Sequence, residues 1–284
     1  MNTYIKSIRY ILTTIVVVFV TSCQVIPSDE QRFEVFTPND SASIKRTSLL
    51  IEYSGWRCVN CPLAAEVAHH LKEQYGQELV VVVMHPESNP NTRYGTNQAV
   101  NYTCPEADSI YMKMGGTSST PFPTGNVNML NATGDATGYM MDKDKWATYI
   151  SQAYSNPLPI TISQLVTEGS TPNSIDIDID LRNLDSKEMQ VTAQVWLTED
   201  EVVGKQKMPD NTTNDAYVHN HLMRASISPI WGEPIQIAAN SSYKLTYQYT
   251  LPDRVVAANC NIVCVITMAG QVVQAAESKI SANK

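Results

Sequence analysis

The stretch GWRCVNCP, residues Gly55–Pro62, places two cysteines two residues apart directly after an apolar run. That run, Ser48–Tyr53 (SLLIEY), is typical of a buried strand. Residues 62–75 carry Leu63, Val67 and Leu71 at helical spacing, with a proline tolerable in the first turn and Gly76 at the end. The cysteine pair therefore lies between a predicted strand and a predicted helix. It is a redox pair, half of a metal site, or a disulfide at a helix start.

A second strand follows the helix. The run ELVVVVMHP, residues 78–86, is apolar through its centre, as expected of a strand covered on both faces. Strand, helix and strand at this length predict a βαβ unit with parallel strands and a right-handed crossover. Residues 107–114 and 144–154 predict two further helices.

The spacing of the cysteines suits thiol chemistry better than metal binding. Unpaired backbone N–H groups and the helix dipole stabilise a thiolate at a helix start, and Arg57 adds positive charge. Such a dithiol attacks a partner disulfide through Cys58 and resolves the mixed disulfide through Cys61. A zinc site needs two more ligands in a similar cluster, and no second Cys-x-x-Cys is present. We expect no metal and no cofactor.

The pattern LLIEYSGWRCVNCP resembles the thioredoxin superfamily in its order of strand, turn, Cys-x-x-Cys and helix. The resemblance implies a thioredoxin-like domain in which Glu52, six residues before Cys58, accepts the proton of the resolving thiol. It also implies a cis-proline loop that faces the cysteines. Phe122-Pro123-Thr124 supplies this loop, with Pro121 as the alternative proline.

The hydrophobic pattern of the sequence changes at Ser155–Pro159 (SNPLP), from mixed helix and strand spacing to short alternating runs. Beyond it, seven short runs separated by turn-forming residues predict strands and no helix. One of them, IDIDIDL at Ile175–Leu181, alternates with period two and predicts a half-buried antiparallel strand. We therefore predict an α/β thioredoxin-like domain over residues 46–155, followed by an all-β, immunoglobulin-like sandwich over residues 159–284.

The N-terminus predicts export. Two basic residues precede an apolar run of eleven residues, Tyr10–Val20. This is too short to span a bilayer, which takes about 20 residues, and it is typical of a signal peptide. The following Val20-Thr21-Ser22-Cys23 resembles a bacterial lipobox, which implies a signal peptide over residues 1–22, acylation of Cys23 and a tether over residues 23–45. The alternative is an ordinary signal peptide that contains a cysteine.

The remaining cysteines and histidines allow more than one role. Apart from the acylated cysteine, five cysteines remain, so at least one thiol is unpaired within a monomer. Cys260 and Cys264 would lie about 13 Å apart on one strand, too far to bond, which predicts core packing. Cys104 is either a buried thiol or a third partner for the redox pair. His219 and His221 share one face of a predicted strand, either as metal ligands with a third donor or, as we expect, as partly buried polar residues.

Four motifs occur together in the chain: the lipobox, GWRCVNCP, PTGNVN and YVHNHLMRA. In these motifs, and over nearly the whole mature chain, the sequence resembles the outer membrane protein 28-related lipoproteins of Bacteroidetes. The resemblance implies the two-domain layout and a lipid-anchored place in the outer membrane. Ser28–Glu30, close behind the anchor, resembles an acidic surface-export tag. The net charge of −8 argues against a nucleic-acid partner.

Together these patterns predict an outer-membrane, cell-surface lipoprotein that binds or assembles with protein partners in the envelope. The alternative is an envelope thiol–disulfide oxidoreductase with Cys58 as nucleophile, Cys61 resolving, Glu52 as proton acceptor and Pro123 shaping the substrate groove. The tryptophan lies two residues before the first cysteine, Val-Asn separates the cysteines and a proline follows them. These departures from the thioredoxin pattern favour the first hypothesis.

Overall fold

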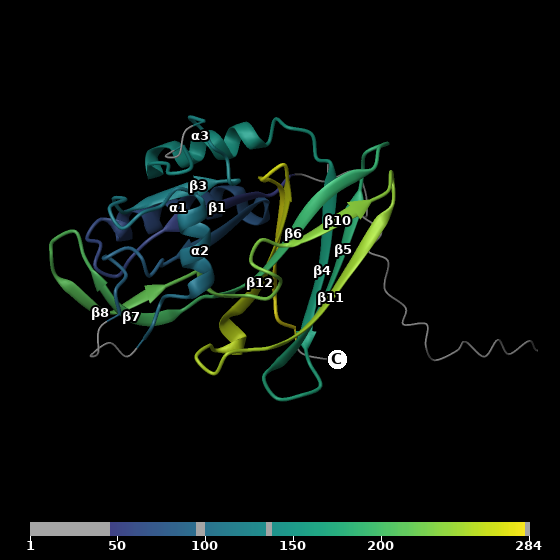
Figure 1. The fold of residues 1–284 in the computed structure, drawn as a ribbon. Helices are drawn as coiled ribbons and strands as arrows, with labels where there is room; N and C mark the ends of the chain where they lie inside the picture. The colour runs from purple at the N-terminus through teal and green to yellow at the C-terminus, as the bar shows by residue number, and fades with distance from the viewer. Residues whose placement is uncertain (1–45, 95–99, 135–137, 282–284) are drawn as a thin grey trace, which may run out of the picture. The chain divides into compact units, whose positions relative to one another are not determined.

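The computed structural model describes residues 46–94, 100–134 and 138–281. The expected signal peptide, the expected acylation site Cys23 and the whole expected tether lie outside these ranges. Within them the fold is mostly β-sheet with three α-helices (Figure 1). None of those helices is both long and apolar enough to cross a membrane.

The predicted strand–helix–strand unit is present. It consists of β1 (Ser48–Tyr53), α1 (Cys61–Tyr75) and β2 (Leu79–Met84), joined by the short helix η1 (Gly76–Glu78). The two strands pair in parallel, as predicted. At the end of α1, Gly76 has φ +55 and its N–H donates to the carbonyl oxygen of Lys72. Glycine adopts this left-handed conformation without strain, so the helix ends where the sequence indicated.

The buried face of α1 differs from the one that the helical spacing predicted. Leu63, expected on the apolar face, is 42% exposed. The face that packs on the sheet is made mainly of small side chains: Cys61, Ala64, Ala68 and Leu71. Small residues permit a close approach of helix and sheet. The buried face of α1 is therefore the one with the smaller side chains, and the larger Leu63 lies outside it.

The largest of the three described sheets takes strands from both the N-terminal and the C-terminal half of the described chain. Its strand order is β13-β12-β6-β9-β2-β1-β3, and β10 also pairs with β6. The strands not yet given are β3 (Thr124–Val127), β6 (Met189–Glu199), β9 (Leu222–Ser226), β10 (Glu233–Ile237), β12 (Cys260–Met268) and β13 (Gln271–Lys279). A parallel contact between Val83 of β2 and Leu222 of β9 joins the β1–β2–β3 part to the rest.

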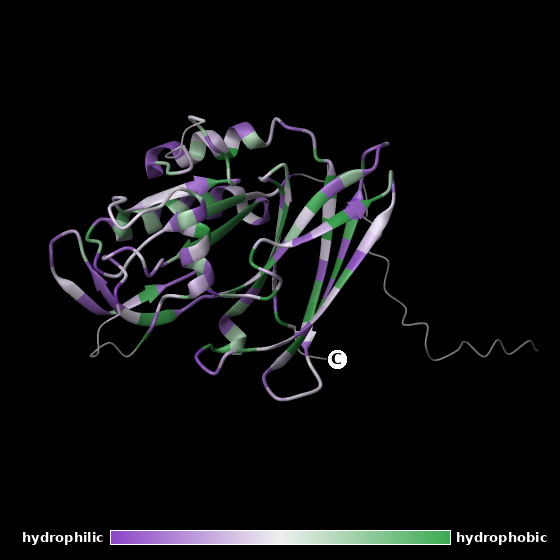
Figure 2. Ribbon diagram, viewed as in Figure 1, coloured by the Kyte–Doolittle hydropathy of each residue, from purple (hydrophilic) through white to green (hydrophobic). Residues whose placement is uncertain are grey.

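The large sheet is covered on both faces. Helices α1 and α3 (Lys143–Ala153) share a hydrophobic core on one side, in which Trp146 is fully buried. Helix α2 (Pro105–Lys113) shares another core on the opposite side. Strands β2 and β12 are mostly hydrophobic (Figure 2), and β1 is fully buried although its sequence includes Ser48 and Glu52. The buried strands were predicted correctly because a strand between two layers shows no polar alternation.

A second, three-stranded sheet packs against the far part of the large sheet. Its order is β11-β5-β4, with all pairs antiparallel, and its strands are β4 (Ile160–Glu168), β5 (Ser174–Asn183) and β11 (Ser242–Thr250). The isoleucines of β5 alternate into the core between the two sheets, which β6, β10 and β12 complete. The half-buried antiparallel strand predicted from IDIDIDL is confirmed.

A separate hairpin, β7 (Val202–Lys207) and β8 (Thr213–His219), is inserted between β6 and β9. In Figure 1 it lies on the opposite side from β4, β5 and β11 and next to the part that carries α1 and β1. Residues Ile44–Lys284 form one compact unit, and the large sheet takes strands from both sides of Ser155–Pro159. That segment separates α3 from β4, whereas a division into two domains there stays a prediction.

Candidate functional site

The two cysteines of GWRCVNCP form a disulfide at the start of α1. A turn precedes it, in which the N–H of Cys58 donates to the carbonyl oxygen of Gly55 at 3.0 Å. The Cα atoms of Cys58 and Cys61 are 5.4 Å apart, within the usual span of a disulfide. Cys58 is 5% exposed and Cys61 is 2% exposed. The pair is therefore closed and buried.

The β7–β8 hairpin holds the loop that carries this disulfide. The side-chain amide of Gln206 donates to the carbonyl oxygens of Cys58 at 2.9 Å and Gly55 at 3.4 Å. The backbone N–H of Lys207 donates to the carbonyl oxygen of Trp56 at 2.7 Å. Hydrogen bonds from a segment about 150 residues further along the chain thus fix the Cys-x-x-Cys loop. Sequence reasoning missed both hairpin residues.

The proline loop lies at the same end of the sheet. The Phe122–Pro123 bond is the one cis peptide bond among the described residues, so Pro123 rather than Pro121 occupies the predicted position. Strand β3 begins at the next residue and pairs antiparallel with β1, with Thr124 opposite Tyr53. Since β1 leads directly into the Cys-x-x-Cys turn, the proline loop and the disulfide lie beyond the same end of β1.

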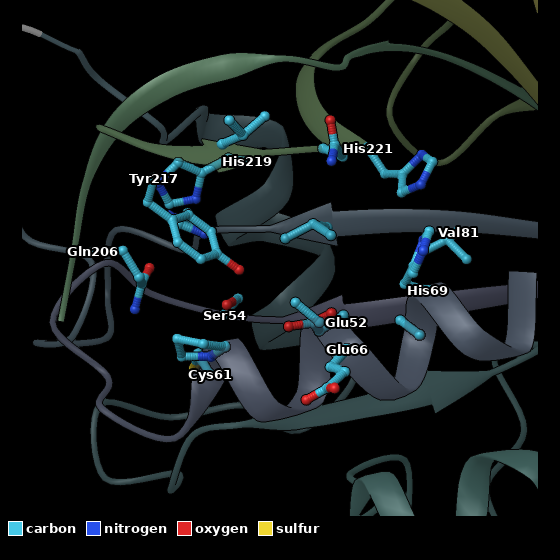
Figure 3. A pocket seen from close by; sticks show the side chains of 17 residues that line it. Glu52, Ser54, Cys61, Glu66, His69, Val81, Gln206, Tyr217, His219 and His221 are labelled. Carbon is cyan, nitrogen blue, oxygen red and sulfur yellow. The ribbon is translucent and has the colours of Figure 1, made fainter. Parts of the chain in front are cut away.

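Glu52 is buried beneath the disulfide loop. It is 1% exposed, and neither carboxyl oxygen has a hydrogen-bond partner. Burial raises the pKa of Glu52 to about 8, and the hydroxyl group of Ser54 opposes the rise. At neutral pH the carboxyl group is therefore mostly protonated, and it faces a cavity that Cys61 also lines (Figure 3).

A cluster of rings lies over this cavity. The His219 ring is 4.5 Å from that of Tyr102 and 4.8 Å from that of Tyr217, measured between centroids. The ring of His85, directly beyond β2, is 5.8 Å from His219, and neither of its nitrogens has a hydrogen-bond partner. Burial lowers the pKa of His85 well below its usual value and that of His219 to about 4. Both rings are neutral at physiological pH.

The shared strand face predicted for His219 and His221 is wrong. Strand β8 ends at His219, and His221 takes a left-handed conformation with φ +58 in the turn before β9. The turn sends the two side chains to different partners: His221 Nδ1 lies 3.3 Å from Asp200 Oδ1. Within the described ranges, no three His, Cys, Asp or Glu side chains are grouped to hold a metal ion.

The three remaining described cysteines are buried free thiols. Cys104 packs among the core residues around α2, and its thiol points to the carbonyl oxygen of Met223 at 3.7 Å. Burial raises the pKa of Cys104 to about 12, as it does for Cys260 and Cys264. A thiol with so high a pKa is a poor nucleophile. The core role predicted for Cys260 and Cys264 is confirmed, and Cys104 is a buried thiol.

The sequence from Met114 to the C-terminus matches the family described as outer membrane protein Omp28, over residues 114–284. The chain belongs to this family, and the protein is an outer-membrane protein.

A solved structure shares the fold of most of the chain. The chain is similar to HBP35 of Porphyromonas gingivalis, with a TM-score of 0.63 and 16% identity over 84% of this chain and 77% of that one. It also matches a domain of the outer membrane lipoprotein Omp28 from Porphyromonas gingivalis, with a TM-score of 0.32 and 21% identity over 45% of this chain and 93% of that one. The comparison with curated proteins found no match.

Proposed function

We propose that the protein is a lipid-anchored, surface-exposed member of its family that binds or assembles with protein partners in the envelope. In this proposal residues 46–155 are a thioredoxin-like scaffold and residues 159–284 an immunoglobulin-like sandwich. Acylated Cys23 supplies the anchor. The Cys58–Cys61 disulfide is a structural bond that fixes the start of α1.

The observation that carries this proposal is the burial of the disulfide and the attachment of its loop to the β7–β8 hairpin. Disulfide exchange requires an attacking thiolate to reach a sulfur atom. Here both cysteines are almost fully buried, and Gln206 and Lys207 tie their loop to the β7–β8 hairpin. These hydrogen bonds must break before the loop can move away from the hairpin and expose both sulfur atoms. A buried and doubly anchored disulfide suits a fixed structural element better than a turnover catalyst.

The position of the disulfide supports the alternative, an envelope thiol–disulfide oxidoreductase. The pair lies at a helix N-terminus, the buried carboxyl group of Glu52 lies beneath it, and the cis bond before Pro123 lies at the same end of the sheet. In this alternative Cys58 attacks, Cys61 resolves, and Glu52 accepts the proton of the resolving thiol. The hairpin would then have to leave the loop in every cycle.

A trapping experiment in cells separates the two functions. Cys61→Ser leaves Cys58 without its resolving partner, so any mixed disulfide that forms with a substrate accumulates. We expect no trapped partner, and the same pattern of envelope proteins cross-linked through lysines in the wild type and in the Cys58→Ser/Cys61→Ser variant. Cys58→Ser alone is the matched control, because it retains one cysteine of the pair but removes the nucleophile. Partners captured through Cys58 and absent from this control would establish the oxidoreductase instead.

A further inference from the structure

A cavity of about 250 Å³ lies between α1, β2 and the end of β8 (Figure 3). The function proposed above gives it no role. Its floor is formed by the sheet, one wall by α1 and the other by the β7–β8 hairpin and the turn that follows.

One part of the cavity is rich in hydrogen-bond acceptors without partners. In Figure 3 the hydroxyl group of Tyr217 points toward Glu52, and Ser54 lies beside them. The Glu52 carboxyl group is 1% exposed, and neither oxygen has a partner of good hydrogen-bond geometry, although the Ser54 hydroxyl group is close enough to lower its pKa. His85 also lines the cavity, and neither nitrogen of its neutral ring has a partner, so it offers one further acceptor as well as one N–H donor. Because a buried polar group without a partner costs free energy, a ligand that supplies N–H donors here is stabilised.

The rest of the lining is mainly apolar, and glutamates without any lysine or arginine accompany it. Aliphatic side chains from α1 and β2 form the walls: Pro62, Ala65, Ala68, Val81 and Val83. No lysine or arginine lines the cavity, whereas two glutamates do, Glu52 inside and Glu66 on α1. An anionic ligand would meet no opposite charge there. A ligand with a positive group and a short hydrocarbon chain matches both parts of the lining.

We propose that this cavity binds a primary alkylammonium group, such as that of a lysine side chain or of a small free alkylamine. The ammonium group donates its three hydrogens to the Glu52 carboxylate and to neighbouring acceptors such as Tyr217 and Ser54. The alkyl chain packs on the aliphatic walls. A metal ion is the poorer occupant, because the described residues offer no group of three ligands. The proposal holds whether or not the disulfide ever opens.

Binding of such a cation is linked to ionisation of Glu52. Burial raises the pKa of this carboxyl group to about 8, so at pH 7 an entering ammonium group displaces nearly one proton. Five titratable side chains around it are uncharged or cationic, Tyr217 and His219 from β8, His85 beyond β2, His69 from α1 and His221 from the turn, and one is acidic, Glu66 on α1. The pKa values of His85, His219 and His221 are lowered by burial, so these rings stay neutral above pH 7. Glu52 therefore dominates the pH dependence.

Isothermal titration calorimetry on the mature chain tests this site. The probes are n-butylammonium, its neutral isostere 1-butanol and the anion butyrate, with Nα-acetyl-lysine-N-methylamide as the arm for a lysine side chain. We expect millimolar or tighter binding of n-butylammonium, about tenfold tighter at pH 9 than at pH 7. At pH 7 we expect nearly one proton released, measured from the dependence of the heat on the buffer. Binding of the lysine amide as tight as that of butylammonium assigns the site to a side chain of a partner, and binding of the free amine alone assigns it to a small ligand.

Two variants complete the test. Glu52→Gln keeps the shape of the side chain and should weaken n-butylammonium binding about tenfold or more, while Glu188→Gln, at an exposed glutamate outside the cavity lining, should change it less than threefold. Circular dichroism confirms that both variants are folded, and the pH dependence of the wild type tests the same link without any substitution. The proposal is overturned if neither cation binds, if 1-butanol binds as tightly as n-butylammonium, or if affinity is unchanged between pH 7 and pH 9.

Discussion

Gln206→Ala should expose the Cys58–Cys61 disulfide to reductant. The substitution removes the two hydrogen bonds that the amide of Gln206 donates to the Cys58 and Gly55 carbonyl oxygens, together with a bond to the carbonyl oxygen of Lys207 that lies within the hairpin and does not hold the loop. Neither oxygen is orphaned, because each also accepts a backbone N–H within the turn, from Cys61 and Cys58 respectively. The loss is therefore close to the net value of about 1 kcal/mol for a good hydrogen bond, plus a smaller amount for the 3.4 Å one, or about 1.4 kcal/mol.

A loss of that size raises the population with the hairpin detached about tenfold. Where opening is fast relative to chemistry, reduction follows the open population. We expect dithiothreitol to reduce the disulfide about tenfold faster in Gln206→Ala than in the wild type under native conditions, measured by alkylation and mass spectrometry. Lys205→Ala is the matched control on the same strand, because the Lys205 side chain is half-exposed and its ion pair with Asp215 spans 3.7 Å. Equal reduction rates in Gln206→Ala and Lys205→Ala would refute the inference that the hairpin shields the disulfide.

Three further predictions concern other parts of the chain. Since the folded protein keeps a proton on Glu52 that the unfolded chain has lost above about pH 4.5, the free energy of unfolding should fall between pH 6.5 and 8 by up to about 1.4 kcal/mol per pH unit. Glu52→Gln should flatten that slope in urea titrations, and an unchanged slope would contradict the assigned pKa. Glu199→Gln should lower the free energy of unfolding by about 3 kcal/mol, because Glu199 Oε2 lies 3.1 Å from Nε of Arg224 and both side chains are almost fully buried. A loss below about 1 kcal/mol in the same urea titrations would show that Glu199 is not needed to balance the buried charge of the arginine. Cys23→Ala should release the protein from the membrane fraction on cell fractionation, and unchanged retention would rule out this residue as the anchor.

Local features of the sequence predicted the N-terminal part of the fold well. The apolar run before the cysteines, the helical spacing with Gly76 behind it, and the second apolar run gave β1, α1 and β2 within one or two residues. A strand buried on both faces and a helix ended by glycine are specified by neighbours in sequence, so they can be recognised there. The disulfide and the cis bond before Pro123 followed from the motif and from its resemblance to a known superfamily.

The packing of the β7–β8 hairpin against the disulfide loop could not be predicted in the same way. Gln206 lies 148 residues after Cys58, in a strand whose sequence, VVGKQK, gives no sign that its glutamine is buried. Its position depends on the pairing of β9 with β2, which is a long-range contact. His85 had a detectable signal, since it follows the carboxyl end of a buried strand. The turn between His219 and His221 had a weaker one in Asn220, a residue type common in turns.

The central claim is that the Cys58–Cys61 disulfide is a closed structural bond under the hairpin of an outer-membrane binding protein. Its reduction potential, measured by equilibration of the mature chain with dithiothreitol buffers, tests this most directly. The hydrogen bonds and burial that hold the oxidised loop stabilise the disulfide form, so we predict a potential below about −300 mV, as is typical of structural disulfides in secreted proteins. A potential between about −120 and −270 mV, the range of thiol–disulfide oxidoreductases, would contradict the account.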